Sequence, residues 1–486
     1  MIFWRVKPLD QILATAEKKA LVRQLGAFQL TLLGIGAIIG TGIFVLTAVA
    51  ANKAGPGMMW SFVIAAAVCA LTALIYAEIA AMVPVAGSAY TYSYAVLGEF
   101  IAWLVGWALV LEYAVAACAV AVGWSGYMNG LLREAGMPLP IMMTAGPWDT
   151  VQLPDGSTAA GGFNVLAFTI SLVITGLLVI GTSKSAKVNA VLVLIKVIAL
   201  TAFIILALPA VNSANFEPMF PTGWGSPIGG TGLGVLGAAA SIFFAYVGFD
   251  AVSTAAEETK NPNRNIPIGL IGSLAVCTVF YLLVAYAAAG AVGAQPGGPL
   301  SQSKEPLAFV LREIGYPKVG NYIGLAAGLA LPSVILMMIY GQTRIFFTMS
   351  RDRLLPEFLS AVHPRFHTPH IITMITGVAV SLFAAMFPVA MLADVSNSGT
   401  LFAFFVVALG VMVLRVKEPT RPRPFRTPFV WVVGPLAMAG CALLFFSLDK
   451  YTLSLFVGWA VIGLIFYFSY GMRNSALVNE EAPASA

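Results

Sequence analysis

Apolar runs of about 20 residues recur along almost the whole chain, and each is long enough to cross a bilayer as an α-helix. The composition agrees, because 59% of the residues are apolar, 10% are charged and the mean hydropathy is +0.90, values outside the range of soluble domains. The sequence therefore predicts an all-α polytopic membrane protein. Twelve transmembrane helices are expected, at roughly 27–51, 58–83, 98–127, 163–181, 188–210, 232–256, 267–293, 320–350, 371–390, 393–414, 429–448 and 451–471.

The distribution of lysine and arginine predicts how these helices are oriented. If the N-terminus lies in the cytoplasm, nineteen of the 26 lysines and arginines fall on the cytoplasmic side and six on the opposite side. Such an excess is typical of the cytoplasmic face. We therefore expect a multi-pass protein of the plasma (inner) membrane with both termini in the cytoplasm. The net charge of +5 follows from this bias and indicates no nucleic-acid partner.

Two of the apolar runs are interrupted near their middles. The sixth run contains Ser241-Ile-Phe-Phe-Ala-Tyr-Val-Gly-Phe-Asp250, and the first contains Gly34-Ile-Gly36-Ala-Ile-Ile-Gly40-Thr-Gly-Ile-Phe44. A helix that breaks within the bilayer exposes backbone groups that only protein or a water-filled cavity can satisfy. Two broken helices at corresponding places in two halves are typical of secondary transporters, which bind their substrate between them.

The segments outside the runs are mostly short and polar. Residues 8–24 have the spacing of an amphipathic helix, so segment 1–26 is expected on the cytoplasmic membrane surface. The linker 415–426 is basic and proline-rich, which is typical of a solvated connector beside an anionic leaflet. The external stretch 128–162 is too polar to span, residues 307–313 have a helical pattern, and segment 472–486 is expected to be a disordered cytoplasmic tail.

The sequence lacks the residue patterns that mark an enzyme. It contains no Ser-His-Asp set and no phosphate-binding loop, and its four cysteines fall inside apolar runs. His363, His367 and His370 share one polar loop, but their uneven spacing is a poor match to a metal site. We therefore predict no catalytic residues, no metal and no cofactor. A channel is also disfavoured, because the polar groups concentrate at one depth and do not follow a continuous pore.

Several motifs, taken in order, resemble the amino acid–polyamine–organocation superfamily. They are Gly36-Ala-Ile-Ile-Gly40-Thr-Gly-Ile-Phe44, Tyr76-Ala-Glu78 with Pro84-Val-Ala-Gly87-Ser-Ala-Tyr90, and Phe243-Phe-Ala-Tyr-Val-Gly-Phe-Asp250 through Glu258-Thr-Lys-Asn-Pro262 to Ile266-Pro267. Within this superfamily, Gly106-Trp-Ala-Leu-Val-Leu-Glu112-Tyr113 resembles the cationic amino acid transporter branch. The resemblance implies two inverted five-helix repeats, 27–210 and 232–414, each headed by a broken helix. Two appended helices then occupy 429–471.

The resemblance also implies where the carboxylate of an amino acid substrate binds. The amides of Thr41 and Gly42 are expected to donate to it, with the Thr41 hydroxyl as an additional donor. The positive end of a half-helix suits a carboxylate. Gly40 and Gly42 lack side chains that would block the approach to the backbone. The alternative is that these glycines serve helix packing, as small residues commonly do in membranes.

The α-ammonium of the substrate is expected to meet carbonyl groups that the two breaks set free. By resemblance these belong to Ile38, Phe244, Ala245 and Val247. The ring of Phe244 also matches the aromatic gate that covers the substrate in this superfamily. The alternative for Phe244 is an ordinary packing or lipid-facing aromatic.

Three side chains in the apolar runs complete the expected site. Lys196 lies near mid-membrane, where ionisable residues are functional by default, and it could bind and release a proton as access alternates; the alternative is a permanently charged strut that bridges carbonyls of the first run. Glu112 could accept from a substrate side chain, directly or through water, or could merely tie its helix to a neighbour. Met338 replaces the small residue typical of cationic transporters and would shorten the side-chain pocket, although methionine is also a common gap-filler.

These observations predict a secondary active transporter of L-amino acids that works by alternating access and proton-coupled symport. The expected substrates are small neutral amino acids such as alanine, cationic ones such as arginine and lysine, or both. An amino acid exchanger and a transport-deficient amino acid sensor remain as alternatives, because they would use the same site.

Overall fold

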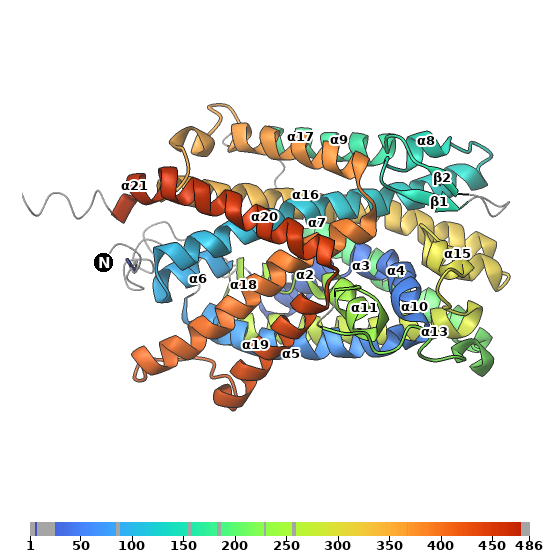
Figure 1. Ribbon diagram of the computed structural model, residues 1–486, viewed down its shortest axis with the longest axis horizontal. Helices are drawn as coiled ribbons and strands as arrows, with labels where there is room; N and C mark the ends of the chain where they lie inside the picture. The colour runs from blue at the N-terminus through green and yellow to red at the C-terminus, as the bar shows by residue number, and fades with distance from the viewer. Residues whose placement is uncertain are drawn as a thin grey trace, which may run out of the picture.

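The computed structural model describes residues 5–6, 25–83, 88–152, 158–181, 186–227, 230–254, 259–366 and 368–477. The amphipathic helix predicted over 8–24 lies outside these residues, as do the Pro84–Gly87 and Glu258 parts of the sequence motifs. The described chain is predominantly helical. It is an elongated bundle in which most long helices run roughly along the longest axis (Figure 1).

The first half of the chain supplies twelve described helical elements and a β-hairpin. They are α2 (Ala27–Ile38), α3 (Thr41–Phe44), α4 (Leu46–Ala54), the 3₁₀ turn η2 (Gly55–Gly57), α5 (Met58–Met82), α6 (Ser88–Val96), α7 (Glu99–Glu134), α8 (Ile141–Thr144), β1 (Thr150–Gln152), β2 (Thr158–Ala160), α9 (Val165–Ile180), α10 (Ala186–Ala207), and the 3₁₀ turns η3 (Leu208–Ala210) and η4 (Ser213–Phe216).

The second half is helical throughout its described elements. They are α11 (Gly234–Ile242), the 3₁₀ turn η5 (Phe243–Tyr246), α12 (Ala251–Thr254), α13 (Pro262–Val292), α14 (Pro299–Gln302), α15 (Pro306–Glu313), α16 (Pro317–Arg351), the 3₁₀ turn η7 (Glu357–Ser360), α17 (His370–Met386), α18 (Val389–Lys417), α19 (Val430–Ser447), α20 (Lys450–Phe466), the π-helical turn η8 (Tyr467–Gly471) and α21 (Met472–Asn474).

Each of the twelve apolar runs contains at least one of these helices, and the protein is an integral multi-pass membrane protein. Among the described residues, eight helical stretches are long and apolar enough to cross a membrane. Four shorter apolar helices, Ala27–Ile38, Val165–Ile180, Gly234–Tyr246 and His370–Met386, accompany them. The predicted boundary between the ninth and tenth runs was wrong, because α17 ends at Met386 and α18 begins at Val389. Phe387-Pro388 makes the turn within continuous apolar sequence.

Both interrupted runs are broken in the structure, as the sequence predicts. The first is divided into α2, α3 and α4, and the sixth into α11, η5 and α12. The pieces α2, α3, α4 and α11 lie near the middle of the molecule in Figure 1. The breaks are therefore surrounded by protein, which an irregular backbone within a membrane requires.

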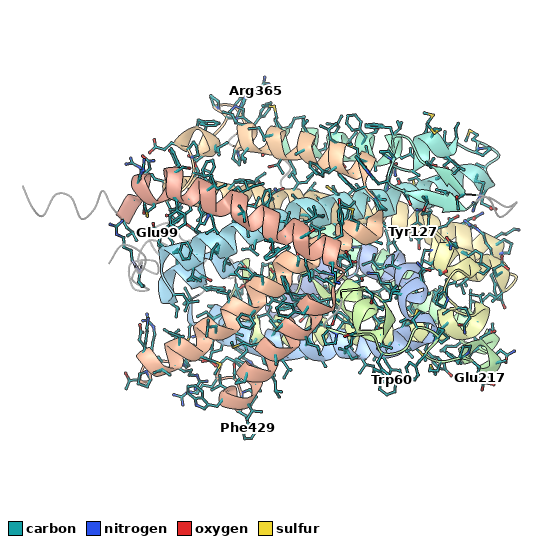
Figure 2. All side chains as sticks on the ribbon, in the orientation of Figure 1. Trp60, Glu99, Tyr127, Glu217, Arg365 and Phe429 are labelled. Atoms are coloured by element: carbon teal, nitrogen blue, oxygen red, sulfur yellow. The ribbon has the colours of Figure 1, made fainter. Side chains whose placement is uncertain are left out.

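Helix α7 is the most deeply buried of the eight long apolar stretches, and indole rings attach α20 to it. The indole N–H of Trp107 donates to the Trp459 carbonyl and the indole N–H of Trp459 donates to the Trp107 carbonyl, each at 2.8 Å. The two rings stack with their centroids 4.6 Å apart. Side chains fill the space between the helices throughout the bundle (Figure 2). An indole N–H within the bundle needs a hydrogen-bond acceptor, so the two bonds between Trp107 and Trp459 also fix the register of α7 and α20.

The expected external segments are partly ordered. Helix α15 confirms the helical pattern predicted over 307–313. The stretch 128–162 departs from an all-helical chain, because β1 and β2 pair antiparallel within it. At this end of the molecule the Glu305 carboxylate accepts from Arg133 at 2.8 Å and from Arg312 at 2.7 and 3.1 Å. These bonds join the end of α7 to α15.

The linker 415–426 is largely exposed, as its composition suggested, but two of its arginines contact the bundle. Glu78, which is buried at the end of α5, accepts two bonds from Arg415 at 2.7 and 2.8 Å and one from the Thr427 amide at 2.8 Å. The Arg423 guanidinium lies 3.3 Å from the same carboxylate and is also buried. A buried carboxylate needs such partners, so Glu78 draws the basic linker onto the bundle.

The two described ends of the chain meet at Glu99, which Figure 2 places at one end of the molecule. The Glu99 amide donates to the Arg5 carbonyl at 2.8 Å. Its carboxylate accepts from the hydroxyls of Tyr94 at 3.0 Å, Tyr467 at 3.2 Å and Ser475. The first residues of the predicted disordered tail, up to residue 477, are therefore ordered, and residues 478–486 lie outside the described chain.

The linker contact predicts a stability change. Glu78→Gln removes the negative charge from between two guanidinium groups, and breaking a buried ion pair in this way costs about 3 kcal/mol. We expect a clear fall in the melting temperature of the detergent-purified protein, measured by the loss of its monodisperse chromatographic peak on heating. Glu418→Gln breaks an exposed pair with Arg421 and should change stability by less than about 1 kcal/mol. Equal effects of the two substitutions would contradict this account of the linker.

Candidate functional site

The two breaks touch each other at glycines. A Cβ on Gly42 of α3 would lie 2.2 Å from the Cα of Ala245, and a Cβ on Gly248 would lie 2.9 Å from the carbonyl oxygen of Ala37. Gly248 also has φ of +117°, a conformation that residues with side chains rarely adopt. A Cβ on Gly40 would meet Val334 at an ordinary distance of 3.5 Å. Gly42 and Gly248 therefore permit the contact between the two broken helices.

A small pocket lies at this crossing. Most of the residues proposed from sequence to bind substrate line it, namely Ile38, Gly40, Thr41, Gly42, Phe244, Val247 and Met338. Ala37, Val120 and Val334 complete the wall. Of the described residues that line the pocket, none carries a charged side chain. The polar groups available there are the backbone of the two breaks and the Thr41 hydroxyl.

Thr41 and Gly42 are the first two residues of α3, and amides at that position have no acceptor within their own helix. The Thr41 side chain is buried, and its hydroxyl makes no hydrogen bond in the structure. A buried hydroxyl without a partner is uncommon. The end of the pocket at Thr41 thus offers N–H and O–H donors, which is the arrangement a carboxylate requires.

The carbonyls expected to accept from an ammonium group are already partly engaged, and Ala245, which carries one of them, is not among the residues that line the pocket. The Tyr281 hydroxyl of α13 lies 2.8 Å from the Ile38 carbonyl oxygen and 2.9 Å from that of Ala245. The Phe244 carbonyl accepts from the Val247 amide at 3.3 Å. Because each carbonyl oxygen has two lone pairs, these groups keep the capacity to accept from a bound molecule.

Glu112 does not line the pocket. It lies eight residues before Val120 on α7, a distance of about 12 Å along the helix axis. The side chain is buried, and neither carboxyl oxygen has a hydrogen-bond partner in the structure. The backbone carbonyl of Glu112 accepts from the Ser396 hydroxyl at 3.0 Å. Glu112 is therefore buried near the pocket helices but outside the pocket wall.

Lys196 lies on α10 and touches the backbone of the first broken run. Its side chain is buried, and its ammonium donates to the Gly36 carbonyl at 2.8 Å. Among the described residues it forms no ion pair. This contact attaches the amine to α2 two residues before Ile38, and it is compatible with either a proton carrier or a fixed strut.

Comparisons with known proteins identify the family of this chain. A family model described as amino acid permease matches residues 25–470. The chain belongs to the amino acid permease family. The permease is 44% identical to a branched-chain amino acid permease of Bacillus subtilis, over 98% of this chain and 99% of the relative. It is 42% identical to a methylthioribose transporter of Bacillus subtilis, with the same coverage. It is 35% identical to cationic amino acid transporter 9 of Arabidopsis thaliana, over 82% of this chain and 68% of that one.

A partly buried ion pair ties three helices of the permease together. The Lys53 ammonium of α4 lies 2.6 Å from Asp394 of α18 and 2.6 Å from the Ser241 hydroxyl of α11. Ser241 also donates to Asp394. The Asn397 amide donates to the carbonyls of Ala240 and Ser241 at 2.7 and 2.9 Å. Asp394 and Glu78 thus form ion pairs, and neither lines the pocket.

Sequence reasoning missed part of the pocket wall. Val120 and Val334 carry no signal, because valine in an apolar run is equally suited to face lipid. Tyr281 did carry one, since a tyrosine in the middle of a buried helix must find an acceptor for its hydroxyl.

The glycine contact predicts the outcome of one substitution. Gly42→Ala places a methyl group against the backbone of Ala245, so the breaks must separate, and overpacking of this kind costs about 1–3 kcal/mol. We expect substrate uptake by reconstituted protein to fall at least tenfold. Gly176→Ala is the control, because no atom lies within 4 Å of a Cβ added at that helical position. Normal uptake by the Gly42 variant would show that the close contact is dispensable.

Proposed function

We propose that this permease is a secondary active transporter that moves neutral aliphatic L-amino acids across the plasma membrane by alternating access. The observation that carries the proposal is the pocket at the crossing of the two breaks. Backbone groups and Thr41 supply its polar side, and Val120, Val334 and Met338 supply an apolar side. Donors for a carboxylate, acceptors for an ammonium and a hydrocarbon wall together suit a zwitterion with an aliphatic side chain.

The pocket favours neutral substrates over cationic ones. A lysine or arginine side chain would have to pass Met338 and end in apolar surroundings, where an unpaired charge is costly. Cationic amino acids are the second candidate, supported by the buried, unpartnered carboxyl group of Glu112. Identity to relatives does not decide the substrate, because relatives of nearly equal identity are named for branched-chain amino acids and for methylthioribose.

The proposed transport cycle uses two inverted repeats, 27–210 and 232–414, with the helices of 429–471 appended. Two breaks at the heads of the two halves support this arrangement. The meeting of Arg5 and Ser475 at Glu99 supports both termini on one side. Together with the excess of lysine and arginine, this favours a cytoplasmic location for both.

Proton-coupled symport is the proposed energy source, with Lys196 as the proton carrier. Its burial, its lack of an ion pair among the described residues and its bond to Gly36 support this role, because losing a proton would weaken its hold on α2 and bias the first broken run toward another conformation. Exchange of one amino acid for another and sensing without transport remain the alternatives that the following measurements separate.

The substrate proposal predicts a competition pattern. Purified protein in liposomes should accumulate labelled L-valine or L-alanine, and unlabelled alanine, valine, leucine and isoleucine should each inhibit that uptake. Lysine, arginine and methylthioribose should inhibit at least tenfold less well, because they lack either a neutral side chain or the zwitterion. Strong inhibition by arginine would favour the cationic candidate, and saturable binding without uptake would favour a sensor.

The coupling proposal predicts a selective effect of Lys196→Met. An inward proton gradient should drive accumulation of substrate by the wild type, and the variant should lose this gradient-driven accumulation. Exchange of internal for external substrate, which needs no net proton movement, should persist in the variant. Gradient-driven accumulation by the methionine variant would identify Lys196 as a strut. If the proton gradient does not change substrate accumulation by the wild type, the result would favour an exchanger.

A further inference from the structure

Tyr281 stands where the two helix breaks meet a third helix. It belongs to α13, its side chain is fully buried, and its hydroxyl reaches two carbonyl oxygens, that of Ile38 at 2.8 Å and that of Ala245 at 2.9 Å. Ile38 is the last residue of α2, and Ala245 lies in the 3₁₀ turn η5. One side chain therefore bridges the backbone of both breaks.

The geometry limits what this hydroxyl can do. A phenol has a single proton to donate, so Tyr281 shares one donor between two acceptors and leaves both carbonyls able to accept again. Its ring is held by edge contacts to Phe62 and Tyr246, with centroids 6.2 and 5.2 Å away. A rigid ring with a shared proton fixes the separation of the two carbonyls and leaves them incompletely satisfied.

We propose that Tyr281 is a substrate-positioning residue, whose hydroxyl holds the carbonyls of Ile38 and Ala245 in the orientation that receives the α-ammonium of the amino acid. This inference rests on the proposed function. Tyr281 acts through the two carbonyls and lies outside the set of residues that line the pocket. Acceptors that are oriented in advance reduce the ordering cost of binding, and without the hydroxyl no other described side chain donates to both breaks.

A second buried tyrosine donates to a backbone carbonyl of the first broken run and serves for comparison with Tyr281. Tyr127, labelled in Figure 2, is also fully buried, and its hydroxyl donates to the Phe44 carbonyl at 2.6 Å. Phe44 belongs to the same broken run but lies outside the break, at the end of α3. Loss of either hydroxyl frees a buried carbonyl of the first run, yet only Tyr281 serves the carbonyls expected to meet the ammonium.

The test compares Tyr281→Phe with the wild type in liposomes. The phenylalanine keeps the ring and removes the shared donor, so we expect the KM for L-valine to rise about tenfold while the maximal rate changes less than twofold. The inhibition constants of three probes with the same side chain are then measured against valine uptake: L-valine, N-methyl-L-valine and L-2-hydroxy-3-methylbutanoate. They present three, two and no ammonium protons.

If Tyr281 is a positioning residue, the increase in inhibition constant caused by Tyr281→Phe should depend on how many ammonium protons the probe carries. The inhibition constant should rise about tenfold for valine, less for the N-methyl compound and under twofold for the hydroxy acid. Tyr127→Phe should shift the constants of all probes by one common factor. If the hydroxy acid inhibits too weakly to be measured, the test compares the increase in inhibition constant for valine with the increase for N-methylvaline. Equal penalties for all probes in the Tyr281 variant, or none, would overturn the inference.

The design separates this inference from the proposed function. If the wild type neither takes up nor binds valine or alanine, the proposed function fails before the variant is compared. If the wild type behaves as proposed and Tyr281→Phe shows no dependence on the ammonium group, only the role of Tyr281 fails. Thermal melting of both variants in detergent confirms that folded protein is compared.

Discussion

The contact between two broken helices is the constraint on which the rest of the structure depends. Freed backbone groups within a membrane cost several kcal/mol each unless they find partners, and here several of those partners are supplied by other helices. Tyr281 serves the carbonyls of Ile38 and Ala245, and Lys196 serves that of Gly36. The hydrogen bonds that stabilise the two breaks are therefore donated by side chains of α13 and α10, next to the pocket.

Charged side chains sort by depth along the bundle. At one end of the bundle Lys53 pairs with Asp394 and Glu305 with two arginines, and at the other end Glu78 pairs with Arg415. Between these ends, Lys196 and Glu112 are buried and form no ion pair among the described residues. Paired charges hold helix ends together, whereas buried charges without counter-ions respond to whatever enters or leaves near them.

The sequence predicted those features that local chemistry dictates. Apolar runs located the helices, glycines at Gly40, Gly42 and Gly248 located both breaks, and the depth of Lys196 marked it as unusual. Features set by distant contacts could not be predicted in this way. Glu78 lies more than 300 residues from Arg415, so the basic linker resembled an ordinary solvated loop. Val120 and Val334 are indistinguishable in sequence from valines that face lipid, and the Phe387-Pro388 turn is hidden by apolar residues on both sides.

The contacts of Arg5 and Ser475 with Glu99 have a consequence for handling the protein. Arg5 and Ser475 are held by the amide and the carboxylate of one residue at the start of α7, and α7 contributes Val120 to the pocket wall. Residues near both ends of the described chain are therefore held together by hydrogen bonds to the first residue of α7. A truncation that removes Arg5 or Ser475 therefore removes a contact of Glu99, and a fluorophore placed near residue 475 should report movements of α7.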